Sequence, residues 1–339
     1  MRLQHRRRSE RGTVIVMAVV VMTVVLGFIA LSVDMGMLMT AQSELQNAAD
    51  AAAFAGVGRL ISADYYGAVE QAWSFATANS CLGQNLALGC GDIQLGIYDF
   101  DQHTFTAAPW GSLGGSNAVR VYARRTEDSA QGSLPLAFAR ILGRNMADVE
   151  ASTIAVVDRR VSGFDGSVAG IMLPFAISED KVGNPPVVGY TFELYPNKTE
   201  EDGLLAAGNF GLLDLDDSNP GTSTLGDWII DGFPGAIEIP ADGNLPMGGA
   251  PGLATALSKA VEERIGEVVV VFVHNAVSEG GENTVYNVVS LVAVEVVSVS
   301  GGGTNLSFTV RVAELPSSGF IVRPGAPWNA SVGKIGLVQ

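Results

Sequence analysis

The sequence predicts an α+β protein: a long N-terminal transmembrane helix that continues into an amphipathic helix, then a small α+β domain, then a β-rich distal domain. Three observations support this prediction. Residues 13–33 form an uninterrupted run of uncharged, mostly apolar residues, and residues 34–61 contain no proline and are rich in strong helix formers. The later apolar runs are mostly short and contain many β-branched residues, as expected for strands.

The apolar run has the length of a membrane span. A helix that rises about 1.5 Å per residue needs ~20 residues to cross a hydrocarbon core of ~30 Å, and no other run in the chain qualifies. The leader, residues 1–12, carries a net charge of +4 from Glu10 and five arginines, namely Arg2, Arg6, Arg7, Arg8 and Arg11. Because Lys and Arg mark the cytoplasmic flank of a span, we expect a single pass through a membrane, with the leader in the cytoplasm and the bulk outside; the resemblance described below implies the cytoplasmic (inner) membrane of a bacterium.

A cleaved signal peptide is the alternative interpretation of the same segment. The leader resembles a basic n-region, and Ala30-Leu31-Ser32 resembles a cleavage site. However, the apolar part of a signal peptide usually spans about 7 to 15 residues, and here a longer run continues directly into a helix. We therefore predict a retained anchor.

The charge of the remaining chain argues against nucleic acid as a partner. Without the leader, the chain has 15 basic and 34 acidic residues, a net charge of −19. A surface of this charge repels phosphates, whereas the basic leader suits anionic lipid.

Cys81 and Cys90 are the only cysteines, and they bound a short glycine-containing loop. In an oxidising compartment outside the membrane, we expect them to form a local disulfide. Two unpaired thiols are the alternative, because spacing alone does not establish the geometry of a disulfide.

Residues 34–61 are predicted to extend the transmembrane helix as one rod with an apolar face. Ala48, Ala52 and Gly56 on this face are small residues four apart, which allow another backbone to approach closely. One alternative is that this face contacts a helix of another protein. The other is that it packs on the globular part of its own chain.

Residues 62–160 are predicted to form the small α+β domain. Strands are expected at residues 92–100, 117–125 and 148–157, with a short helix at residues 134–142 ended by Gly143. A linker follows near residues 162–170.

The distal domain is assigned to residues 170–315. Its strands are expected at 171–177, 187–195, 209–215 and 267–277, with a final hairpin of 286–300 and 305–312 around Gly301-Gly302-Gly303. Two helices are expected, near residues 224–231 and 253–265, and the tail, residues 316–339, is expected to be mainly loop.

The residues that usually carry catalysis are scarce. His5, His103 and His274 are the only histidines, and we interpret His274 as a hydrogen-bonded residue at a strand end. The common hydrolase, zinc and nucleotide-binding motifs are absent, so no catalytic residue, cofactor or metal is predicted. Asp214, Asp216 and Asp217 are weak candidates for a calcium site, and a turn is the preferred interpretation.

The N-terminal motifs resemble those of TadG-type proteins of the tight-adherence (Tad/Flp) pilus-assembly system. The resemblance rests on Arg11-Gly12, on Val33-Asp34-Met35-Gly36, and on SELQNAADAAA at residues 43–53. DIQLGIYD at residues 92–99 and FARILG at residues 138–143 resemble the continuation of such proteins, up to about residue 158.

This resemblance implies a non-enzymatic accessory protein of pilus assembly, tethered in the membrane, with other pilus-assembly or pilin components as partners. Two departures narrow the expectation. The Asp-x-Ser-x-Ser metal motif of von Willebrand A domains is absent, and Met17 occupies the place of the glutamate that follows a prepilin cleavage site after Gly12.

Two other functions are weighed against this one. A membrane-tethered binding module for cell-wall glycan or another envelope polymer would use aromatic residues, for which Trp110, Trp228 and Trp328 are candidates. A surface hydrolase is disfavoured by the few histidines and the missing nucleophile motifs.

Overall fold

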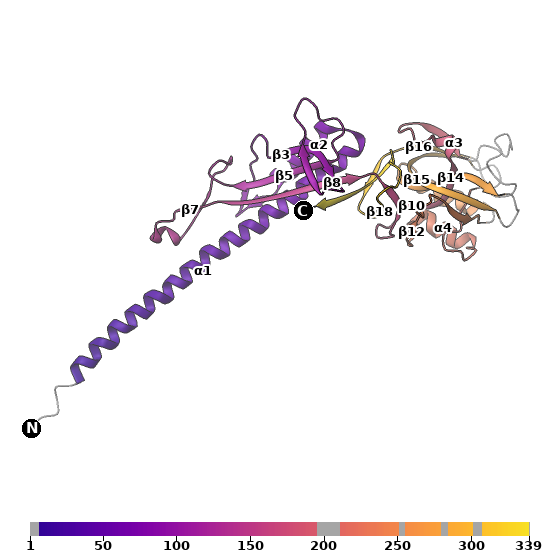
Figure 1. The fold of residues 1–339 in the computed structure, drawn as a ribbon. Coiled ribbons are helices and arrows are strands. Elements are labelled where there is room, and N and C mark those ends of the chain that lie inside the picture. Colours follow the sequence, from indigo (N-terminus) through magenta and orange to yellow (C-terminus); the bar gives the residue numbers. More distant parts are fainter. Residues whose placement is uncertain (1–6, 195–210, 251–254, 279–283, 301–306, 339) are drawn as a thin grey trace, which may run out of the picture.

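The structure is a computed structural model of the chain, which describes residues 7–194, 211–250, 255–278, 284–300 and 307–338. One long helix leads into two folded units that lie one beyond the other (Figure 1). The first unit is built around the distal half of this helix, and the second is rich in strands. The predicted α+β class is confirmed.

Helix α1 (Arg7–Val57) runs without a break through two different environments. Its 51 residues correspond to a length of about 77 Å. The apolar side chains of its first part are exposed, including Val14 at 66% and Phe28 at 68%, and this is the helix that is long and apolar enough to cross a membrane. In its second part the residues of one face are fully or almost fully buried, namely Ala41, Leu45, Ala48, Ala49, Ala52, Ala53 and Val57.

A second helix packs against this buried face. The 3-10 helix η1 (Gly58–Ser62) turns the chain, and α2 (Tyr65–Ala78) begins where the Asp64 carboxylate accepts a hydrogen bond from the Gly67 N–H. Ala68, Ala72 and Ala76 of α2 are buried, so alanines line this helix contact on both sides. Short side chains let the two backbones lie close together.

The first sheet has six strands in the order β17-β19-β8-β5-β3-β4. Its strands are β3 (Ile93–Asp99), β4 (Thr104–Ala107), β5 (Ala118–Arg125), β8 (Val149–Asp158), β17 (Leu315–Ser317) and β19 (Val332–Val338). All neighbours are antiparallel except β17 and β19. The second part of α1 packs on β5 and β8, so the rod is a core element of this unit.

Two short hairpins extend the first unit. One is formed by β1 (Ser80–Cys81) and β2 (Gln84–Asn85), and the other by β6 (Leu134–Pro135) and β7 (Met146–Ala147) with the 3-10 turn η2 (Ala139–Leu142) between them. The predicted helix at residues 134–142 is therefore wrong except for this last turn. Its first residues pair as a strand, while Gly143 ends the turn with a positive φ of 83°.

The second unit is built on a six-stranded sheet in the order β10-β14-β15-β16-β11, with β13 also paired to β15. Its strands are β10 (Met172–Ser178), β11 (Thr191–Leu194), β13 (Leu245–Gly248), β14 (Val268–Ser278), β15 (Val285–Ser300) and β16 (Ser307–Val312). Helix α4 (Thr222–Asp231) packs on β10, α5 (Thr255–Glu262) packs on β15, and the one-turn helix α3 (Glu179–Val182) follows β10. The predicted hairpin of β15 and β16 is confirmed, although Gly301 to Gly303 lie outside the described residues.

The two units are joined by more than one segment. Strand β8 continues almost directly into β9 (Val161–Phe164), which pairs with β12 (Ile237–Glu238) and β18 (Phe320–Val322) in a small third sheet. The chain then returns from the second unit, and residues 334–338 of β19 pair with residues 154–158 of β8. The predicted loop tail is wrong, because residues 316–339 contain β18, β19 and most of β17.

Other expected strands differ in extent. The strand predicted at 209–215 is present only as the isolated bridges of Leu212 to Phe175 and of Leu213 to Gly249, and residues 209 and 210 lie outside the described residues. The expected linker at 162–170 is partly strand β9. Helix α5 is shorter than its predicted range of 253–265.

The close contact at Gly56 predicts a selective loss of stability on substitution. A Cβ at this position would lie 2.8 Å from the carbonyl oxygen of Ala68 and 3.0 Å from Ala72 Cβ. We expect Gly56→Val to destabilise the first unit by about 1–3 kcal/mol, because the backbones must separate. Gly36→Val is the matched control, since its Cβ would meet nothing within 4 Å in the same helix. Denaturant unfolding of the full chain in detergent, followed through tryptophan fluorescence, compares the two.

Candidate functional site

The small-residue face of α1 is occupied by the chain itself. Ala48 and Ala52 are 1% and 0% exposed, and Gly56 faces Ala68, Ala72 and Val119. Of the two sequence interpretations, the structure agrees with packing on the chain's own domain. The helix-contact face that was predicted for a partner is therefore not free in this structure.

The same two helices also carry exposed aromatic side chains. Tyr66 and Trp73 of α2 are 74% and 42% exposed, Phe75 is 44% exposed, and Phe54 of α1 is 39% exposed. Tyr66 and Trp73 lie on one side of α2, whereas Phe75 lies on nearly the opposite side of this helix, so we call Tyr66 and Trp73 alone the aromatic face. Sequence reasoning missed it, although the spacing of seven residues between Tyr66 and Trp73 places them on one side of a helix.

Asp34 forms a second local arrangement, where α1 leaves the apolar run. Its side chain is almost fully buried, and its carboxylate accepts hydrogen bonds from the backbone N–H groups of Ala137, Phe138 and Ala139 at 2.9, 3.1 and 2.6 Å. The first carboxylate after the span is thus fixed by the turn of the β6–β7 hairpin.

Both predicted disulfide cysteines are free thiols in the structure. Cys81 is buried in β1, whereas Cys90 is exposed in the following loop, so the two side chains lie in different environments. Burial raises the pKa of the Cys81 thiol, with partial compensation from the positive charge of Arg125. The predicted bond is absent from this structure.

The acidic segment Asp214, Asp216 and Asp217 folds as a turn. The Asp214 carboxylate accepts hydrogen bonds from the backbone N–H of Ser218 at 3.2 Å and of Asn219 at 2.7 Å, and Asp216 accepts one from Ser218 at 3.0 Å. These oxygens hold the local backbone. The described part of the chain contains no group of three or more His, Cys, Asp or Glu side chains arranged to hold a metal ion.

A cleft of about 590 Å³ lies at the joint between the two units. Its walls come from η1, the turn after β3, the end of β8 and the segment before β19, and they include Asp101, Asp158, Arg160 and Glu314. Arg160 forms an ion pair with Asp158 at 2.7 Å, and its guanidinium lies 4.7 Å from the Phe100 ring centre. The hydrogen bond to Asp158 raises the pKa of Arg160.

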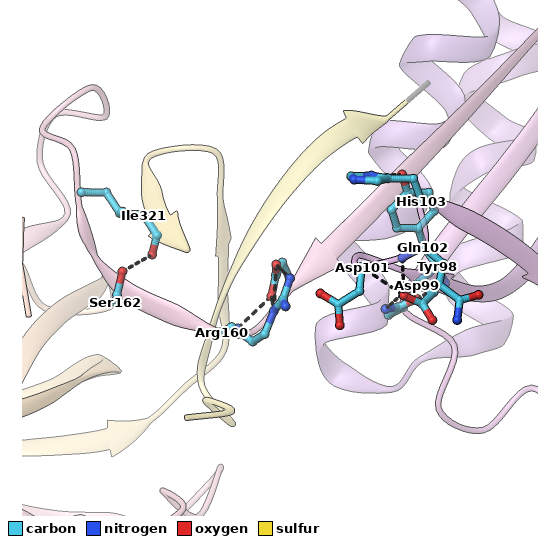
Figure 2. A network of polar contacts seen from close by, with 10 residues as sticks. Tyr98, Asp99, Asp101, Gln102, His103, Arg160, Ser162 and Ile321 are labelled. Atoms are coloured by element: carbon cyan, nitrogen blue, oxygen red, sulfur yellow. Dashed lines mark hydrogen bonds and ion pairs between the residues drawn. The ribbon is translucent and has the colours of Figure 1, made fainter. Parts of the chain in front are cut away.

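Figure 2 shows the polar network beside this cleft. The Asp99 carboxylate accepts hydrogen bonds from the backbone N–H of Asp101 and Gln102, both at 2.9 Å, and these bonds lower its pKa. His103 Nδ1 lies 3.4 Å from the Tyr98 hydroxyl in the same turn. His103 thus belongs to a turn on the surface, and its charge is one of the smaller causes that lower the pKa of Asp99.

Arg159, next to Arg160 in the chain, connects segments that meet at the joint between the two units. Its guanidinium donates hydrogen bonds to the carbonyl oxygens of Ala330 at 3.0 Å, Leu60 at 3.3 Å and Ile61, and it lies 4.8 Å from the Trp328 ring centre. Burial lowers the pKa of this guanidinium from its ordinary value. One side chain therefore connects the end of the rod to the segment that leads into β19.

His274 is buried inside the second unit. It is 1% exposed, its ring lies 5.0 Å from the Tyr286 ring, and its Nδ1 has no hydrogen-bond partner among the described residues. Burial lowers the pKa of His274 to about 4. The expectation of a hydrogen-bonded strand-end histidine is thus wrong, because the residue lies within β14 in an apolar environment.

The three candidate tryptophans do not share an environment. Trp228 is 7% exposed and packs on Phe233, whereas Trp110 and Trp328 are exposed, with Trp328 covered on one side by Arg159. Trp228 is therefore a core residue.

Replacement of Arg159 should loosen the joint. We expect Arg159→Met to destabilise the protein by about 1–3 kcal/mol, because three carbonyl oxygens lose a charged donor. Hydrogen exchange of the backbone amides of β19 should become faster, whereas Arg144→Met, at an exposed site in the β6–β7 hairpin, should leave those amides unchanged. Unchanged exchange in β19 of the Arg159 variant would contradict the assigned role.

The second unit should lose stability in mild acid. The folded-state pKa of His274, about 4, lies below the ordinary value of 6.5, so the unfolded chain binds more protons between these values. Its contribution is complete above pH 6.5 and should fall by about 1–3 kcal/mol as the pH decreases toward 4. Denaturant unfolding at pH 7 and pH 5, followed through tryptophan fluorescence, should show a smaller pH dependence in His274→Phe than in the exposed-site control His103→Gln.

Comparisons with known proteins found matches to two protein families in the N-terminal part of the chain. Residues 12–59 match the model of the TadE/G-like Flp pilus-assembly family, and residues 38–155 match that of a Tad-like Flp pilus-assembly family. Searches of curated proteins and of solved structures gave no match. The predicted resemblance is thus confirmed for residues 12–155, which are similar to Tad/Flp pilus-assembly proteins and comprise most of α1 and the first unit as far as β8.

Proposed function

We propose that this protein is a single-pass, non-enzymatic accessory component of Tad/Flp-type pilus assembly. Residues 13–33 anchor it in the cytoplasmic membrane with the basic leader inside, and both folded units project outside. The two units act by holding a contact surface at a fixed place above the membrane.

The continuity of α1 is the observation that carries this proposal. The helix has exposed apolar residues along its first part and buried residues along one face of its second part, with no change of secondary structure between them. Exposed apolar side chains over such a length are stable in lipid and unfavourable in water. A helix of this kind supports a rigid arm, because the anchor is also a core element of the first unit.

The surroundings of the cleft arginines and of His103 and His274 support the non-enzymatic role. Two arginines of the cleft have partners within the chain: Arg159 donates to backbone carbonyls, and Arg160 is paired with Asp158. His274 is buried, and His103 belongs to a turn. Neither arrangement provides the nucleophile and base that catalysis of acyl transfer requires.

The aromatic face is our candidate for the surface that contacts other pilus components. Tyr66 and Trp73 are exposed on one side of α2, within the family-matched region. Clustered aromatic residues contribute strongly to protein interfaces. Since the small-residue face of α1 is buried, the aromatic face replaces it as the surface available to a partner.

Counting pili on cells tests this function. Deletion of the gene should reduce surface pili and adherence, and the wild-type chain should restore both. The double variant Tyr66→Ser/Trp73→Ser should fail to restore them, because loss of two aromatic contacts costs about 2 kcal/mol or more at an interface.

Trp110→Ser is the matched control for this experiment, as it removes an exposed tryptophan outside the aromatic face. It should restore pili fully. Normal piliation in the deletion strain would overturn the proposed function, and normal piliation with the double variant would overturn only the choice of surface. Loss of binding to purified cell wall in Trp110→Ser would support the envelope-binding alternative.

A further inference from the structure

The β6–β7 hairpin, residues 134–147, lies beside the point where α1 leaves the apolar run. The three hydrogen bonds from Ala137, Phe138 and Ala139 to Asp34 fix its turn there. In Figure 1 this hairpin reaches farther toward the N-terminal end of α1 than any other part of the folded units. If residues 13–33 occupy the hydrocarbon core, Asp34 and the hairpin turn lie at its outer boundary.

The hairpin exposes apolar side chains at this level. Ile141 is 79% exposed, Met146 is 52% exposed and Phe138 is 40% exposed. On α1 itself, Met35 and Met39 are 49% and 69% exposed just beyond Asp34. Single exposed apolar residues are common on proteins, but here they occur both in the hairpin whose turn binds Asp34 and in the adjoining part of α1, and water does not favour such a concentration.

The hairpin is positively charged, whereas the protein as a whole has a net negative charge. Arg140 and Arg144 are its only charged residues, and both are exposed, whereas the whole chain has a net charge of −15. Exposed arginines beside apolar side chains are suited to the headgroup region, where the apolar groups enter the acyl boundary and the guanidinium groups bind phosphates. The charge therefore favours an anionic lipid surface as the occupant.

We propose that the β6–β7 hairpin is a second membrane contact, which inserts Phe138, Ile141 and Met146 into the outer leaflet and binds phospholipid phosphates through Arg140 and Arg144. The Asp34 carboxylate positions it at the correct depth. This contact requires the membrane anchor of the proposed function and is independent of the role in pilus assembly. It prevents the first unit from tilting about the end of the span.

A depth measurement on the full chain tests this contact. The chain, with Cys81→Ala and Cys90→Ser, carries a single environment-sensitive fluorophore at Ile141→Cys in vesicles of phosphatidylethanolamine and phosphatidylglycerol. We expect blue-shifted emission and quenching by lipids with a nitroxide near the headgroup. Gln102→Cys, in the exposed turn after β3 at the other end of the sheet, is the water control, and Phe28→Cys in the span is the lipid control.

The arginines are tested in the same vesicles. The double variant Arg140→Gln/Arg144→Gln should reduce the quenching of the label at residue 141. In the labelled chain that keeps both arginines, the quenching should weaken when phosphatidylcholine replaces the anionic lipid. Asp34→Ala should also weaken it, since the hairpin turn loses its acceptor, while the Phe28 label stays quenched.

Three outcomes would overturn the proposal. An Ile141 label as accessible to water as the Gln102 label, with the Phe28 label quenched, would exclude the contact and leave the anchor intact. A Phe28 label in water would exclude the anchor and the contact together. An Ile141 label that is shielded in native membranes but accessible in lipid vesicles would assign the hairpin to a protein partner.

Discussion

Helix α1 is continuous, yet its first part has the composition suited to lipid and its second part packs within a folded unit in water. The rest of the structure depends on this constraint. In lipid, each backbone hydrogen bond has to be made within the helix, and the side chains that face outward have to be apolar. In water, the same helix has to bury one face, which it does through alanines and glycine against α2, β5 and β8. The position of the first sheet relative to the membrane follows directly from the helix axis, because no flexible linker separates the anchor from the core.

The joint between the units extends this rigidity outward. Strand β8 runs from the first sheet almost directly into β9, and Arg159 between them binds carbonyl oxygens at the end of η1 and before β19. A guanidinium can hold several carbonyl groups in one plane, which a single-point donor such as Lys cannot do. The second unit is thus connected to the rod by hydrogen bonds as well as by the chain. Such a connection favours a scaffold over a pair of freely moving domains.

Much of this fold was predictable from local sequence signals. The apolar run at 13–33, the strands β3, β5 and β8, and the long strands β14 and β15 have lengths and compositions that define them without tertiary information. The tail was not predictable in this way. Val332–Val338 contains two glycines, and only its pairing with β8, distant in the sequence, makes it a strand. The hairpin at 134–147 was mistaken for a helix because its apolar residues have no clear period, and its conformation depends on Asp34.

The candidate surfaces were harder to predict than the fold. Ala48, Ala52 and Gly56 have the spacing of a helix contact, and the sequence correctly identified the contact but could not identify its partner. The exposed aromatic residues of α2 were missed because the sequence alone does not define which side of a short helix is covered. The charges on both sides of the apolar run can be read from the sequence. The role of Asp34 cannot, because it depends on a turn about a hundred residues farther along the chain.

The pairing of β19 with β8 has a consequence for biogenesis. In the proposed topology, β8 is exported before β19, so the outer edge of β8 stays unpaired until the entire second sheet has been synthesised. An open strand edge is a template for aggregation, and pairing between segments so distant in sequence is slow. The nascent chain therefore needs protection during this interval, through an envelope chaperone or through rapid folding of the second sheet, and overproduction should be limited by this waiting period rather than by insertion of the anchor.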